Sequence, residues 1–99
     1  MRAEDLYRAG ALARKTVRLE SRGIDVEIQE LTVAARAEIM DLNAAGEQSM
    51  IGPVVVKYGT VAMKDEDVDT IANSLSPDMV SELAGHIMTL SGLGDDSGN

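Results

Sequence analysis

Hydrophobic and polar residues alternate over residues 16–20 and again over residues 24–29. The apolar positions are Val17, Leu19, Ile24, Val26 and Ile28. Alternation with a period of two gives each strand one apolar face, and the Ser-Arg-Gly sequence at residues 21–23 supplies a tight turn whose glycine can adopt a positive φ. The pattern predicts a two-stranded β-hairpin. Because such a hairpin is at best marginally stable alone, we expect it to pack against helices or another chain.

From residue 32 onward, the apolar residues recur at the spacing of a helix. They are Val33, Ala37 and Met40, with Ala35, Ile39 and Leu42 beside them. Thr32 is a natural N-cap for this helix, because its hydroxyl can accept a backbone N–H of the first turn. Gly46 suits the position just after the last turn. The sequence therefore predicts a helix between these two residues.

The clearest helix start is Ser76-Pro77, a capping hydroxyl followed by proline at the first helical position. This last helix is expected to end at Gly92. A shorter helix over residues 68–75 is expected before it, entered through an acidic stretch in which Asp65 or Asp67 acts as the cap. At the other end of the chain, residues 3–13 predict a short helical arm with a thin apolar stripe.

Residues 51–63 leave two alternatives open. Three consecutive valines at 54–56 favour a strand by propensity, whereas Pro53 suits the first turn of a helix. Val54, Tyr58 and Val61 also share one helical face. We favour the helix, although Gly52 and Gly59 weaken it.

These elements predict a single α+β domain, mostly α, over residues 1–93. It comprises an N-terminal helical arm and a two-stranded β-hairpin followed by a small bundle of three to four helices. Residues 94–99 contain no apolar side chain and are predicted to form a disordered C-terminal tail.

The composition excludes several classes of protein. The chain has no cysteine, which rules out disulfides and thiolate metal sites. No run of 18 apolar residues exists, and the N-terminus lacks the apolar core of a signal peptide, so we expect no membrane partner. With no Trp or Phe and only two Tyr, the core has to be built from aliphatic side chains and methionine.

The net charge of −8 is unevenly distributed. Residues 1–22 carry six Lys or Arg against three Asp or Glu, a balance of +3, while residues 23–99 carry three against fourteen, a balance of −11. Nucleic-acid binding requires a basic footprint, which the body lacks, so we expect no nucleic acid as a partner. The asymmetry permits attraction between the basic start of one chain and an acidic body.

Catalytic and metal-binding chemistry is nearly absent. Asp65, Asp67 and Asp69 begin like a calcium-binding EF-hand loop, but the required glycine and glutamate are replaced by Thr70 and Ser76. His86 is the single histidine and lies one turn after Glu82, which is too little for a zinc site or an activated nucleophile. We therefore expect no cofactor, no metal and no enzymatic activity.

Five short sequence features occur in the order typical of one protein family. They are a helical stretch Ala3–Lys15, a hairpin Thr16–Glu30 with Gly23 at its turn, Glu30-Leu31-Thr32 with Arg36, Asp65-Glu66-Asp67-Val68, and Leu90-Ser91-Gly92-Leu93. This ordered set resembles the small tail assembly chaperones of long-tailed bacteriophages and prophages. The stretch 51–63 departs from the family, which usually has a smoother helix-forming run there.

The resemblance implies a non-enzymatic chaperone that acts in the host cytoplasm and is absent from the mature virion. Its expected partners are the tape measure protein, which is a very long helical polypeptide, and the tail tube protein. Self-association is also expected, because a lone hairpin edge offers backbone groups for strand pairing.

The candidate partner-binding residues come from two elements. Ile24, Val26 and Ile28 are expected to pack with the Thr32 helix. The ridge formed by Met79, Leu83, Ile87 and Leu90 offers either part of a groove for a partner helix or the core of the monomer. An alternative function is an acidic DNA mimic or regulatory binding protein of phage origin, and another small phage morphogenetic protein is a third.

Overall fold

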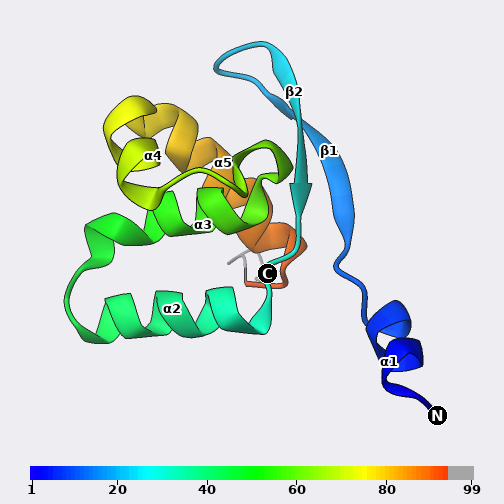
Figure 1. Cartoon of the computed structure of the whole chain (residues 1–99). Coiled ribbons are helices and arrows are strands. Elements are labelled where there is room, and N and C mark those ends of the chain that lie inside the picture. Colours follow the sequence, from blue (N-terminus) through cyan, green and yellow to red (C-terminus); the bar gives the residue numbers. More distant parts are fainter. Residues whose placement is uncertain (94–99) are drawn as a thin grey trace.

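The computed structural model describes residues 1–93, and the predicted tail at 94–99 lies outside the described residues. The elements are α1 (Ala3–Ala9), β1 (Arg14–Leu19), β2 (Ile24–Gln29), α2 (Val33–Ala44), α3 (Ile51–Gly59), α4 (Val68–Ser74) and α5 (Pro77–Leu90). Short 3-10 turns at Gln48–Met50 and Val61–Met63 flank α3. The predicted fold class is confirmed: within the described residues, a helical arm and a hairpin precede four helices (Figure 1).

The hairpin has one apolar and one charged face. Val17 is paired with Val26 and Leu19 with Ile24 across the antiparallel strands, which places these side chains on the inner face. On the outer face, Arg18 contacts Asp25 at 3.1 Å and Arg14 contacts Glu27 at 3.9 Å. Gly23 has φ +66° at the turn, as expected.

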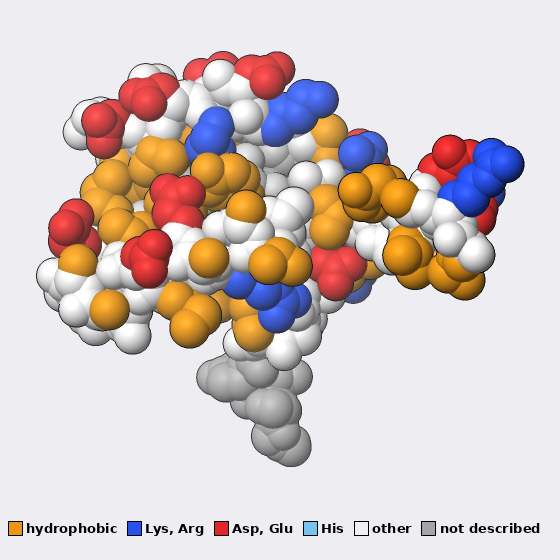
Figure 2. Space-filling view, turned by 60° about the horizontal axis from the view of Figure 1, so that its bottom comes forward, with side chains coloured by type: hydrophobic (Ala, Val, Ile, Leu, Met, Phe, Trp, Pro, Cys, Tyr) orange, Lys and Arg blue, Asp and Glu red, His pale blue; other side chains and the backbone are white. Residues whose placement is uncertain are grey.

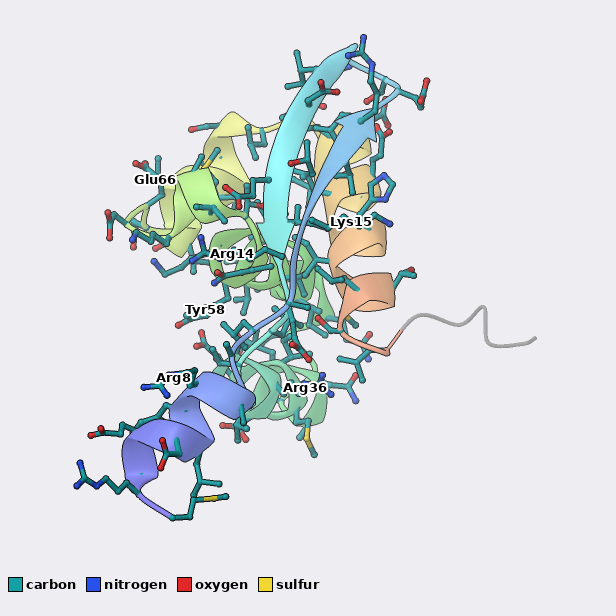
Figure 3. All side chains as sticks on the ribbon, turned by 90° about the vertical axis from the view of Figure 1, so that its right-hand side faces the viewer. Arg8, Arg14, Lys15, Arg36, Tyr58 and Glu66 are labelled. Carbon is teal, nitrogen blue, oxygen red and sulfur yellow. The ribbon has the colours of Figure 1, made fainter. Side chains whose placement is uncertain are left out.

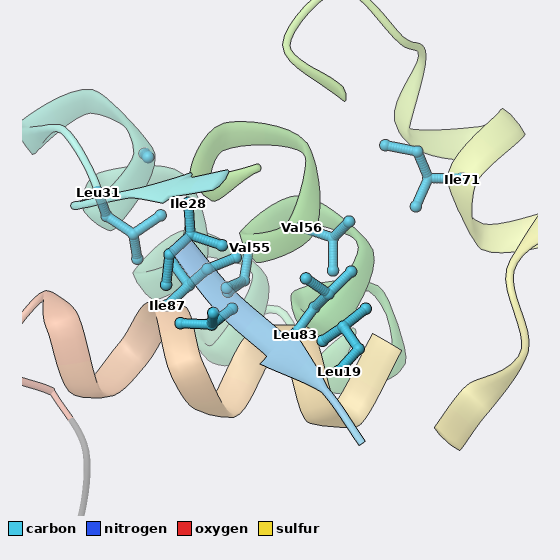
Figure 4. Close-up of a cluster of buried hydrophobic side chains, with 10 residues drawn as sticks. Leu19, Ile28, Leu31, Val55, Val56, Ile71, Leu83 and Ile87 are labelled. Atoms are coloured by element: carbon cyan, nitrogen blue, oxygen red, sulfur yellow. The ribbon is translucent and has the colours of Figure 1, made fainter. Parts of the chain in front are cut away.

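Helix α3 lies at the centre of the fold, where α2, α4, α5 and β2 pack around it (Figure 1). Its central turn, residues 53–56, is buried on all sides, which is why the sequence there is apolar all round. Figure 4 shows Val55 and Val56 of α3 near Leu83 and Ile87 of α5. The core is aliphatic throughout, as the composition predicts. Its buried members are Val17, Leu19, Ile28, Leu31, Ala35, Val54, Val55, Val56, Ile71, Leu83 and Ile87.

The helix favoured for residues 51–63 is found, but it ends earlier than predicted, at Gly59. Thr60 is extended (φ −109°, ψ 117°) and forms an isolated antiparallel bridge with Ile28. The two glycines that weakened the prediction have a packing role. A Cβ at Gly52 would lie 2.9 Å from Val80, and one at Gly59 would overlap Ile87, so both glycines allow α3 to approach α5 closely.

Most of the predicted helix ends are found. The Thr32 hydroxyl accepts the Ala35 N–H at 3.0 Å, and the Ser76 hydroxyl accepts the Met79 N–H at 3.4 Å. Gly46 and Gly92 follow α2 and α5 with φ +77° and +76°. Asp67 occupies the N-cap position of α4, although its side chain makes no capping hydrogen bond there.

The N-terminal arm is shorter than predicted and stands apart from the body. Helix α1 ends at Ala9 instead of residue 13, because Gly10 follows it, and it has no buried residue. It extends away from the bundle at the lower right of Figure 1. The tertiary contacts of the fold therefore begin at the base of the hairpin.

Candidate functional site

The structure separates the seven candidate partner-binding residues by burial. Three of them, Ile28, Leu83 and Ile87, are at most 1% exposed. Val26, Met79 and Leu90 are half-buried, and Ile24 is 44% exposed. The ridge on α5 therefore belongs to the core of the monomer, which was the second of its two alternatives, and it forms no open groove in this conformation.

The expected packing of the hairpin needs correction. The inner face of the hairpin lies against α5 and α3, whereas α2 packs mainly on α3. From the sequence, the hairpin was expected to pack with the Thr32 helix. Helix α5 occupies this position instead, because its buried ridge continues the apolar surface of the strands.

A junction between β2, α2 and α5 is built from residues of two of the family-like motifs. The buried Ser91 hydroxyl accepts the Leu31 N–H at 2.9 Å, and the Ser91 carbonyl accepts Arg36 Nη2 at 2.6 Å. Glu30 extends the junction to the root of the arm: its Oε1 accepts the Ala13 N–H at 2.9 Å, and its own N–H donates to the Ala13 carbonyl at the same distance. Segments about sixty residues apart in sequence are thus joined at one point.

The hairpin turn is attached to α5 by Glu82. One carboxylate oxygen accepts the Glu20 N–H at 2.6 Å, and the other accepts the Ser21 hydroxyl at 2.6 Å and the Ser21 N–H at 3.3 Å. The Ser21 hydrogen bond lowers the pKa of Glu82 below its ordinary value, and the two backbone donors and His86 act in the same direction, against partial desolvation. Glu82 therefore has a structural role, the attachment of the hairpin turn to α5, which the sequence analysis did not identify.

Helix α2 exposes an apolar stripe. The stripe, called the α2 outer stripe below, consists of Val33, Ala37, Met40 and Ala44, all exposed. Val33 is 85% exposed and Met40 is 70% exposed. The buried side of α2 is the opposite face, formed by Ala35, Ile39 and Leu42, of which Ala35 is fully buried. Figure 2, viewed from the side of α2, shows hydrophobic side chains spread over this face among a few acidic ones.

A hollow of about 360 Å³ borders the stripe, between α2 and the end of α5. Its lining residues are Arg36, Ile39, Met40, Met88 and Leu93. Four of the five are apolar, and the guanidinium of Arg36 is directed to Ser91. The stripe and the hollow together form an apolar surface with methionine side chains, which adapt readily to different partners. This surface can bind an apolar helix face, and its lining offers no nucleophile or general base.

The sequence contained a signal for the α2 outer stripe. A surface helix normally has one apolar face, whereas residues 33–44 carry apolar residues on two opposite faces. The surplus indicates a second contact surface. No comparable signal identified Ser91, because a single serine near a helix end has no distinctive pattern.

Residues 1–93 contain no group of three His, Asp or Glu side chains arranged to hold a metal ion. Within the same residues, no helix is both long and apolar enough to cross a membrane. Comparison with protein-family models, with curated proteins and with solved structures found no match to this chain.

Proposed function

We propose that this chain is a non-enzymatic tail assembly chaperone of a long-tailed bacteriophage or prophage. The observation that carries the proposal is the junction at Ser91. The Glu-Leu-Thr-x-x-x-Arg and Leu-Ser-Gly-Leu motifs are each short and unspecific, yet Leu31 and Arg36 of the first both bind Ser91 of the second. A shared structural role gives a reason for the two motifs to occur together in one fold.

The exposed apolar surface supports the same proposal. The tape measure protein is expected to be a very long helix with apolar stripes, and the α2 outer stripe with its hollow is an open apolar surface on which such a helix can lie. In this proposal Val33 and Met40 contact the client. Arg36 holds α2 in place beside the end of α5 through its hydrogen bond to the Ser91 carbonyl. The chaperone acts in the host cytoplasm, also brings tail tube subunits to the tape measure protein, and is absent from the mature virion.

The acidic DNA-mimic alternative is less well supported. A mimic of nucleic acid needs a row of free carboxylates, but Asp25 and Glu27 of the hairpin are paired with Arg18 and Arg14. The acidic residues near the entry of α4 lie on a separate part of the body.

Co-expression with the tape measure protein of the same genome tests the proposal. We expect the tape measure protein to become soluble and to co-elute with several copies of this chain, as measured by light scattering. The Val33→Ser/Met40→Ser variant should lose this effect, whereas Ala34→Ser, an exposed change on α2 outside the stripe, should retain it. A tape measure protein that stays insoluble beside the folded chain would overturn the proposal, and salt-sensitive binding to a purified basic DNA-binding protein would favour the mimic.

A further inference from the structure

Helix α1 is formed without any surface to support it. It has seven residues and none is buried. Leu6 is 60% exposed and Tyr7 is 79% exposed on its apolar side, and Glu4 and Arg8 belong to its polar side. An isolated helix shorter than about 12 residues is marginal in water, so a helix of this length requires an apolar surface to be stable.

The α2 outer stripe has the shape that α1 requires. Its members are spaced at i, i+4, i+7 and i+11, so it forms one straight line of about 17 Å along α2. Helix α1 is about 10 Å long. The stripe is therefore long enough to accept Leu6 and Tyr7 side by side, and its own apolar side chains have no cover within residues 1–93.

The geometry of the arm root favours a stripe on another copy. Ala13 is held to Glu30 by two hydrogen bonds through its backbone, so the chain leaves the hairpin in a fixed direction, away from the body (Figure 1). Charge does not oppose the same pairing. Residues 1–13 carry two Arg against one Glu and one Asp, so the side chains of the arm are neutral overall and add no repulsion against an acidic body. Figure 3 shows Arg8 on the arm, and Arg14 and Lys15 further along the chain, where the hairpin begins.

The free edge of the hairpin is a poorer contact between copies than the sequence suggested. The β2 edge is already partly occupied, because Ile28 forms the bridge with Thr60. The Gln29 side chain also contacts this segment, since its Nε2 donates to the Tyr58 carbonyl at 3.2 Å. The β1 edge carries Arg14, Lys15 and Arg18, and pairing two such edges would bring like charges together.

We propose that copies of this chain associate by arm exchange, in which Leu6 and Tyr7 of one copy pack on Val33, Ala37 and Met40 of another. The inference does not depend on the proposed chaperone function, because it concerns the purified chain alone. Where a client binds the same stripe, it competes with the arm.

Light scattering and sedimentation over a concentration series test arm exchange. The wild-type chain should associate, and Leu6→Ser/Tyr7→Ser should raise the dissociation constant by at least about 100-fold, because two apolar anchors are lost. The matched control is Glu4→Ser/Arg8→Ser, which alters the polar side of the same helix without changing the net charge. Neither double variant can unfold the body, because α1 has no buried residue.

A mixing experiment identifies the two surfaces. The arm variant Leu6→Ser/Tyr7→Ser and the stripe variant Val33→Ser/Met40→Ser should each be monomeric. Their mixture should form a one-to-one heterodimer, because one intact arm and one intact stripe remain. A monomeric wild type, or a mixture that stays monomeric, would overturn the proposal.

Disulfide trapping locates the contact more closely. Since the chain has no cysteine, Tyr7→Cys and Met40→Cys on separate copies should form a disulfide-linked dimer on mixing. Arg8→Cys with Met40→Cys should not, because Arg8 lies on the polar side of α1. A disulfide formed within a single chain that carries both Tyr7→Cys and Met40→Cys would contradict exchange between copies.

Discussion

Thr60 is a buried residue whose hydroxyl has no hydrogen-bond partner within residues 1–93. Removing an unsatisfied hydroxyl while keeping the shape of the side chain removes its desolvation cost. We expect Thr60→Val to raise the free energy of unfolding by about 1 kcal/mol, measured by urea denaturation. The exposed Thr70→Val should change it by less than about 0.5 kcal/mol. A lower free energy of unfolding for Thr60→Val would contradict the view that the Thr60 hydroxyl is buried without a hydrogen-bond partner.

Replacing each of two helical glycines by alanine should change the stability of the fold in opposite directions. Gly59→Ala places a methyl group into Ile87 and should destabilise the fold by about 1–3 kcal/mol. Gly85 lies inside α5, and apart from its neighbours along the helix no atom of residues 1–93 lies within 4 Å of where its methyl group would be. Gly85→Ala should therefore stabilise the fold by about 0.5–1 kcal/mol. Thermal unfolding of both variants measures the contrast, and equal effects would show that α3 and α5 are not closely packed.

At the scale of the elements, the Ser91 junction fixes where α2 starts relative to α5. Ser91→Ala removes the acceptor of the buried Leu31 N–H and leaves this donor unpaired. We expect a loss of about 1–3 kcal/mol in the free energy of unfolding. Ser81→Ala, at an exposed position of α5, is the control and should have little effect. Retained stability in Ser91→Ala would mean that water replaces the hydroxyl.

The attachment of the hairpin to α5 should depend on pH. Because the pKa of Glu82 is lower in the folded chain, its ionised form stabilises the fold above the ordinary glutamate pKa of about 4.3, and this contribution is lost as the pH falls through the lowered pKa. Urea denaturation should therefore show a larger difference between wild type and Glu82→Gln at pH 7 than at pH 3. Ser21→Ala, which removes the largest contribution to the shift, should reduce the pH dependence of the wild type; an unchanged profile would exclude Ser21 as its cause.

The elements differ in how far they could be predicted. The hairpin and the caps at Thr32 and Ser76 follow from local chemistry, so their positions were predictable from neighbouring residues. Helix α3 was ambiguous because its valines favour a strand, and only burial among four other elements decides for a helix. In the candidate site, the exposed side of α2 could not be chosen from periodicity, since both of its sides are apolar. The position of Ser91 depends on contacts about sixty residues away.

On the scale of the whole molecule, stability should be concentrated around α3. Native-state hydrogen exchange should find the slowest amides near Val55 and Ile87, which are buried at the centre of the core. The amides of α1 should exchange fastest in a dilute sample and become protected as the concentration rises. Strong protection of α1 in dilute solution would show that the arm is docked on its own copy.

The hydrogen bonds of Glu20 and Leu31 have a consequence for biosynthesis. Their partners, Glu82 and Ser91, are translated about sixty residues later. At about 5–20 residues per second, the hairpin emerges roughly three to twelve seconds before the helix that holds it is complete. During this interval the nascent chain presents two apolar strands and an uncovered arm, and the hydrogen bonds of Glu20 and Leu31 can form only once translation of α5 ends.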